Sequence, residues 1–167
     1  MNLETAFDKL VSAHGRYYDL IKDHPVNPFD AEAIFFKHDL QYLLTKRAKI
    51  TEYDMGEYVF FAKVESLNEE TLSKYVDEAW SILMERVNPT PTHRNTDVVI
   101  YILTENTDYG VDKAVRKTRR YKSYKYGLHG FSHLKLVVYD ISNGNAYFNR
   151  VAHDRRKVID NIFKDAD

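Results

Sequence analysis

A run of positive side chains interleaved with tyrosines is the stretch whose chemistry stands out. It extends from Lys113 to Tyr126, and between Lys113 and Tyr139 the chain has eight Lys or Arg and no Asp or Glu. Positive side chains neutralise phosphates, and tyrosine rings stack on unpaired bases. The sequence therefore predicts an anion-binding surface made by these residues: Arg116, Lys117, Arg119, Arg120, Tyr121, Lys122, Tyr124 and Lys125.

The remaining chain carries the opposite charge. The formal net charge is only −1, so sixteen cations face twenty-five anions outside the segment from Lys113 to Tyr139. A protein with segregated charge attracts anionic partners, here nucleic acid or an acidic protein, and can self-associate through its opposite patches. The alternative is structural: the cations are a solvated helix face whose tyrosines pack on a sheet, and they pair with Asp77, Glu78 or Glu85 of the same chain.

Motifs for catalysis or metal binding are missing from the sequence. Without cysteine there is no disulfide, thiol nucleophile or Cys-based zinc site, and no HExxH motif, Walker loop or G-x-G-x-x-G occurs. His129 and His133 are four residues apart, but Gly130 and Phe131 between them argue against the helix that would aim both at one metal. We therefore expect no catalytic residue, no metal and no cofactor.

Two other functional classes stay open beside a non-catalytic binding protein. One is an enzyme of unrecognised class with a pocket near residues 127–133, in which His129 or His133 acts as acid or base. The other is a homo-oligomeric structural protein whose acidic and basic faces pair. The deciding observation is whether the cations are free or already neutralised by carboxylates of the same chain.

Hydrophobic periodicity predicts the elements that position the cationic segment. The unbroken apolar run Val98 to Leu103 predicts a strand buried on both faces. Apolar residues at helical spacing predict a helix of about six turns from Leu3 to Ile21, which Gly15 could kink or break. They predict a second helix from Leu72 to Val87, which opens with a capping box at Ser66 to Glu69. A third helix, roughly Tyr109 to Arg120, is expected to be capped by the segment Asn106 to Asp108.

Further strands are expected on either side of the central one. Ala31 to Lys37 is ambiguous and could form a short helix. Tyr42 to Ile50 and Glu57 to Val64 are predicted to form a hairpin around a turn at Glu52 to Gly56. Lys46, Arg47 and Lys49 extend the cationic surface if this hairpin lies beside it.

The C-terminal part predicts a second hairpin and a last helix. Asn143-Gly144 is a strong hairpin turn between the strands Phe131 to Asp140 and Ala146 to Val151, and Val151 to Phe163 is expected to be helical. A two-residue turn pairs Tyr139 with Phe148, on the face opposite Leu134, Leu136 and Val138. Either both faces of the sheet are covered, or the turn is longer.

These elements predict a single α+β domain over residues 1–167, in the order α-β-β-α-β-α-β-β-α. We expect about five strands in a mostly antiparallel or mixed sheet with helices packed on it. No apolar run approaches the roughly 20 residues of a membrane helix, and no signal peptide is visible, so a cytoplasmic protein without a membrane partner is expected.

Short motifs spread over most of the chain carry a resemblance to a known family. They are Phe35-Phe36, Tyr42-Leu43-Leu44, Lys46 to Ile50, Glu57 to Phe61, Lys122-Ser123-Tyr124, Gly127, Gly130-Phe131 and Asn149-Arg150. Through them the chain resembles a family of small bacterial proteins catalogued only as a domain of unknown function, in which Trp often stands at the position of Phe131. The resemblance implies a compact bacterial α+β domain and transfers no activity.

Overall fold

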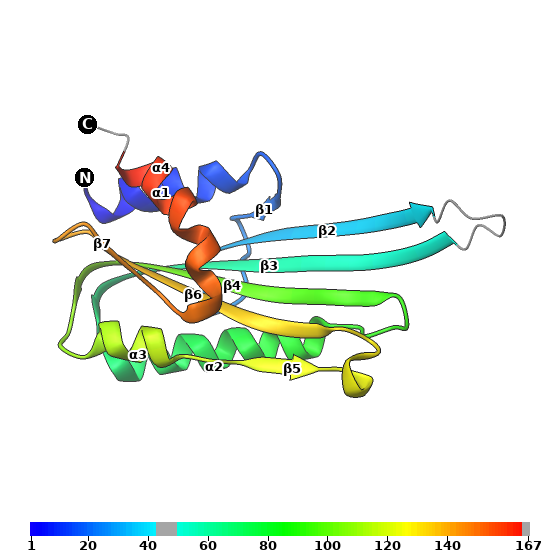
Figure 1. Ribbon diagram of the computed structural model, residues 1–167. Coiled ribbons are helices and arrows are strands. Elements are labelled where there is room, and N and C mark those ends of the chain that lie inside the picture. The colour runs from blue at the N-terminus through cyan, green and yellow to red at the C-terminus, as the bar shows by residue number, and fades with distance from the viewer. Residues whose placement is uncertain (43–49, 165–167) are drawn as a thin grey trace.

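A seven-stranded mixed sheet forms the centre of the computed structural model, which describes residues 1–42 and 50–164 (Figure 1). The strands are β1 (Asp19–Ile21), β2 (Ala31–Tyr42), β3 (Ile50–Leu67), β4 (His93–Thr107), β5 (Tyr121–Ser123), β6 (Phe131–Asp140) and β7 (Asn145–Phe148). Their order is β1-β2-β3-β4-β6, and both β5 and β7 pair with β6. The predicted α+β class and mixed sheet are confirmed. The structure has seven strands where about five were expected, and β1, β2 and β5 lie mostly in segments that were not predicted as strands.

Helices cover both faces of this sheet (Figure 1). They are α1 (Leu3–His14), α2 (Glu69–Arg86), α3 (Val111–Lys117) and α4 (Arg156–Phe163), with the 3-10 helices η1 (Lys125–Gly127) and η2 (Arg150–Arg155). Strands β3, β4 and β6 are parallel neighbours joined through α2 and α3. The chain moves from β3 to β4 and from β4 to β6 in the same direction across the sheet. Because crossovers between parallel strands are right-handed, α2 and α3 therefore lie on the same face of the sheet. Helices α1 and α4 lie on the other face.

The double cover explains the central apolar run. Val98 to Leu103 in β4 is at most 1% exposed, so the predicted strand buried on both faces is confirmed. Alternate residues enter two separate cores. Ile100 packs on the α2 side with Leu136, and Tyr101 packs on the α1 and α4 side with Val137.

The β6–β7 hairpin answers the question of register. Asp140 pairs with Asn145 and Val137 pairs with Phe148, so four residues, 141–144, connect the strands. The turn is therefore longer than two residues, and the pairing of Tyr139 with Phe148 is wrong. Both faces are covered as well, because Phe148 packs in the core under α4.

The N-terminal helix is shorter than predicted. It ends at His14, and Gly15 caps it with its N–H on the Ser12 carbonyl. Asp19–Ile21 then pairs with β2, so the prediction of a helix that continues to Ile21 is wrong, whereas the alternative of a break at Gly15 is confirmed. The pairing with β1 satisfies backbone N–H and C=O groups at the edge of β2, which a continued helix would leave unpaired.

The start of α2 also differs from the prediction, although the helix itself is confirmed. Asn68 is the N-cap, and its side chain accepts a hydrogen bond from the Thr71 N–H at 2.8 Å. Ser66 still belongs to β3, and its hydroxyl donates to the Asn106 amide oxygen at 2.9 Å. The predicted capping box is therefore wrong, because the strand continues to Leu67.

Strand pairing also decides the ambiguous segment after β1. Ala31 to Lys37 is strand rather than helix, because it pairs antiparallel with β3 over its whole length. The predicted turn at Glu52 to Gly56 lies inside β3 and is wrong. Most of the strand predicted from Tyr42 to Ile50, with Lys46, Arg47 and Lys49, lies outside the described residues.

The cationic segment adopts three conformations rather than one helix. The predicted helix Tyr109 to Arg120 is reduced to α3, which begins after Gly110 at φ +93°, because β4 runs on through Thr107 in place of the expected cap. At Thr118 the backbone becomes extended, with ψ 123°. The link of residues 118–120 then leads into β5. Among the described residues, no helix is both long and apolar enough to span a lipid bilayer.

Candidate anion-binding site

The outer edge of β6 has a gap between two short strands. β5 pairs with residues 131–133 of β6, and β7 pairs with residues 137–140. Between them, the Leu134 N–H donates to the Arg120 carbonyl at 3.1 Å, and the Leu136 N–H donates to Oδ1 of Asn149 at 2.9 Å. The link after α3 and one amide side chain therefore replace a strand at this point.

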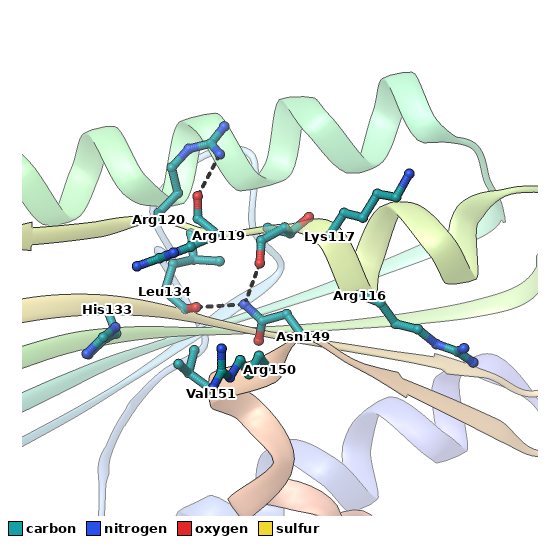
Figure 2. Close-up of a pocket in the computed structure, with 10 residues that line it drawn as sticks. Arg116, Lys117, Arg119, Arg120, His133, Leu134, Asn149, Arg150 and Val151 are labelled. Carbon is teal, nitrogen blue, oxygen red and sulfur yellow. Dashed lines mark hydrogen bonds between the residues drawn. The ribbon is translucent and has the colours of Figure 1, made fainter.

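Asn149 holds the two sides of the gap together. The side chain is buried, and its Nδ2 donates to the carbonyl oxygens of Leu134 at 2.9 Å and Thr118 at 3.1 Å (Figure 2). Its backbone N–H donates to the Leu136 carbonyl at 3.1 Å. The start of η2 and the end of α3 are thereby fixed against β6.

A pocket of about 280 Å³ lies at this gap (Figure 2). Its lining is Arg116, Lys117, Thr118, Arg119, Arg120, His133, Leu134, Asn149, Arg150 and Val151. We call it the cation pocket, because five of these side chains are Lys or Arg and none is a carboxylate. Four of the five cations come from the segment around the end of α3, and Arg150 comes from the first turn of η2.

Most of this positive charge is not neutralised by the part of the chain that the structure describes. Arg120 pairs with Asp77 of α2 at 2.8 Å, and Arg116 lies 3.9 Å from Asp112. Both are surface pairs, worth about 0–1 kcal/mol. Within residues 1–42 and 50–164, no ion pair involves the other three cations of the pocket: Lys117, Arg119 and Arg150. The predicted pairing with α2 carboxylates is therefore met by one arginine only.

The structure divides the eight predicted residues into three groups. Arg116, Lys117, Arg119 and Arg120 line the cation pocket. Lys122, Lys125 and Tyr121 are exposed on the β5–β6 hairpin but do not line the pocket. Tyr124 does not lie on the surface, because it is buried and its hydroxyl is 2.9 Å from Oγ of Ser132. Burial raises the pKa of Tyr124.

Asn149 and Arg150 are site residues that we did not predict as such. They follow the cationic segment by more than twenty residues, and neither residue type has a distinctive spacing there. The signal that could have found them is the Asn143-Gly144 turn. A return strand antiparallel to β6 brings its own end back toward Leu134 and therefore toward the link after α3.

The histidines named for an enzyme do not converge in this pocket. His133 lines it, whereas the Nδ1 of His129 donates to the Pro89 carbonyl at 2.8 Å in the connection before β4. The nearby Asp97 accepts the backbone N–H of His133 at 2.9 Å, and burial raises the pKa of this carboxyl. The pocket lining thus offers one histidine and no carboxylate residue.

A second polar cluster lies on the α1 and α4 face and is internally paired. Glu57 of β3 accepts a hydrogen bond from Tyr18 at 2.6 Å and forms an ion pair with Arg155 of η2. Burial, followed by the Glu57 carboxylate, raises the pKa of Tyr18 to about 12. His14 is buried beside Tyr101, and burial lowers its pKa. This cluster anchors η2 and α1 on the sheet through the ion pair of Glu57 with Arg155, whereas the buried Nε of Arg155 and the buried hydroxyl of Tyr101 have no hydrogen-bond partner among the described residues.

Metal binding finds no support in the described part of the chain. There, no three His, Asp or Glu side chains lie close enough together to hold a metal ion. The chemistry available at the cation pocket is instead recognition of negative charge. Guanidinium groups form paired hydrogen bonds to phosphate or carboxylate oxygens, and lysine ammonium groups add point charges.

Comparison with known proteins confirms the family resemblance. A family model described as a domain of unknown function (DUF8052) matches residues 2–161, so the chain belongs to this family. No curated protein and no solved structure matches the chain. Its bacterial origin stays a prediction from the sequence.

Proposed function

We propose that this protein is a non-catalytic binding protein that holds a negatively charged group of its partner in the cation pocket. The observation that carries the proposal is the lining, which includes five Lys or Arg residues and no carboxylate residue. Like charges gathered in one pocket repel each other, and an anion placed among them removes that repulsion. The partner classes considered are nucleic acid and an acidic protein.

The dimensions of the pocket support a group rather than a whole small molecule. At about 280 Å³ it lies just below the 300–1,000 Å³ typical of pockets that enclose drug-sized ligands. A phosphate or carboxylate on a larger partner fits this volume, and the rest of the partner extends over the surrounding surface. Arg119 and Arg150 approach from different elements, the link after α3 and the start of η2, and can contact different oxygens of one group.

The residue that fixes the backbone of this site is different from the residues that carry its positive charge. Asn149 fixes the backbone of the gap through buried hydrogen bonds, whereas four of the five cations around it are exposed. A site whose backbone is already ordered loses less entropy when the anion binds. Replacing one exposed arginine should therefore weaken binding without unfolding the site.

Titration with inorganic tripolyphosphate by calorimetry at low salt tests the proposal. We expect binding that weakens as salt rises. Arg119→Gln and Arg150→Gln should each weaken binding about tenfold or more, because each removes a charge-assisted hydrogen bond worth about 1.5–3 kcal/mol. The control is Lys9→Gln, which removes one exposed positive charge from α1 on the sheet face opposite α2 and α3.

Two results would count against the cation pocket. Absence of binding at low salt would remove the proposed function. An equal loss in Lys9→Gln and Arg119→Gln would show that overall charge, rather than this pocket, attracts the anion. Sedimentation over the same salt range tests the homo-oligomer alternative, in which the mass falls to that of a monomer as salt rises.

A further inference from the structure

Three ring side chains form a patch on neighbouring strands next to the cation pocket. Tyr121 of β5 pairs in register with His133 of β6, and Phe131 is two residues before His133. Residues opposite each other and residues two apart point to the same face of a sheet. The ring centroids of Tyr121 and Phe131 lie 4.9 Å and 5.2 Å from that of His133, and 6.3 Å from each other.

This patch is exposed although it is aromatic. Tyr121 is 48% and Phe131 37% exposed. Nine large apolar side chains are exposed in residues 1–37 and 54–164, where the structure describes side-chain burial. Four of them lie between positions 121 and 131, the other two being Tyr126 and Leu128. Helices α1 and α4 cover the end of the sheet away from the β5–β6 hairpin (Figure 1). Clustered exposed apolar side chains mark surfaces that meet a partner.

The patch and the cation pocket are continuous through His133. Its ring packs against Tyr121 and Phe131, and the same residue lines the pocket with Arg119 and Arg150. A partner that places an anionic group in the pocket therefore has rings within reach of its neighbouring parts. Lys122 and Lys125, both exposed on the same hairpin, extend the positive charge along it.

This combination selects among anionic partners. An acidic peptide uses the cations, but its carboxylate side chains gain nothing from exposed rings. In a duplex the base faces are stacked on each other, so side-chain rings cannot stack on them. A single strand offers regularly spaced phosphates together with free base faces, and proteins that bind it pair a positive groove with aromatic side chains.

We infer that the partner is a single-stranded nucleic acid, with a phosphate in the cation pocket and an adjoining base stacked on the Tyr121–Phe131–His133 patch. The inference rests on the proposed function and adds the ligand class. It assigns the rings a role in affinity that is independent of the charge contacts, so the two contributions can be measured separately.

Fluorescence anisotropy provides the test. The ligands are a labelled 12-nucleotide oligothymidylate and an abasic oligomer of equal length and charge, and tripolyphosphate is the competitor. Wild-type protein should bind oligothymidylate more tightly than the abasic oligomer. Tyr121→Leu and Phe131→Leu keep apolar bulk but remove the ring, and each should weaken oligothymidylate binding about fivefold or more. Both should leave tripolyphosphate binding unchanged, whereas Arg119→Gln should weaken all three. Tyr17→Leu, at a tyrosine 68% exposed after α1, is the matched control.

The outcomes separate the two proposals. Equal affinity for the abasic oligomer and oligothymidylate in the wild-type protein would overturn stacking while leaving the anion site intact, and this comparison needs no variant to fold. Tighter binding of polyglutamate than of oligothymidylate would identify an acidic protein as the partner. Tighter binding of a duplex would exclude the single strand. Failure of all anions to bind at low salt would remove both proposals.

Discussion

The substitution Asn149→Asp tests whether the Asn149 side chain holds the backbone around the cation pocket in place. It replaces only one NH2 group by oxygen. In the wild-type protein, Nδ2 of Asn149 donates to the carbonyl oxygens of Leu134 and Thr118 at 2.9 and 3.1 Å. A carboxylate oxygen in its place cannot donate to either and faces both at contact distance. Oδ1 can still accept the Leu136 N–H, so the backbone trace is kept.

The magnitude follows from these two lost hydrogen bonds. Each contributes about 0.5–1.5 kcal/mol, and a buried carbonyl left without a donor costs about 1–3 kcal/mol more. We expect Asn149→Asp to lower the free energy of unfolding at pH 7 by about 3 kcal/mol or more. For a chain of this size, that corresponds to a fall in the melting temperature of about 6–12 °C.

The loss should also depend on pH. Burial and the two carbonyl oxygens raise the pKa of an aspartic acid at this position above the ordinary value of about 3.9, because both disfavour the ionised form. The cations of the pocket oppose the shift, but they are exposed to solvent, and such pairs contribute only about 0–1 kcal/mol. A raised pKa in the folded state means that stability is kept at low pH and lost as pH rises through the folded-state pKa. The deficit relative to wild type should therefore be smaller at pH 4 than at pH 7.

Urea unfolding followed by circular dichroism at pH 4 and pH 7 measures both effects. Asn27→Asp is the matched control, because this residue lies in the connection between β1 and β2 with an exposed side chain and should change stability by no more than about 0.5 kcal/mol. If Asn149→Asp were as stable as the control at pH 7, the buried bridge would not stabilise the gap. A deficit independent of pH would contradict the assigned contact of the new carboxyl with two carbonyl oxygens.

Three other predictions concern positions outside the pocket. Gly130→Ala should destabilise the protein far more than Gly127→Ala in thermal unfolding. Both glycines have a positive φ, which costs about 1–2 kcal/mol for alanine. Only at Gly130 would the added Cβ lie 2.1 Å from the Arg94 carbonyl oxygen. Asn68→Ala should cost about 1 kcal/mol in urea unfolding by removing the N-cap of α2, and an unchanged midpoint would contradict that role. Because burial lowers the pKa of His14, the folded protein should lose stability as pH falls below 6.5, and His14→Gln should lack that part of the pH dependence.

Local patterns were enough to predict the layers of this fold. The apolar run in β4 indicates a strand with both faces covered, and the apolar stripe from Leu72 to Val87 indicates α2, because each depends only on the period of one element. The same holds for the Asn143-Gly144 turn, although not for its length. The cationic segment was visible as well, and four of its residues do line one pocket.

Long-range pairing decided the rest. Both β5 and β7 join the same edge of β6 and leave a gap, and this brings Asn149 and Arg150 to residues 116–120. No local period records that choice, because strand partners are selected by how well distant surfaces pack and pair. The same cause buries Tyr124 against Ser132 while leaving Tyr121 in solvent. Sequence alone thus determined which residues carry the charge, and the tertiary structure determined which of them face one another.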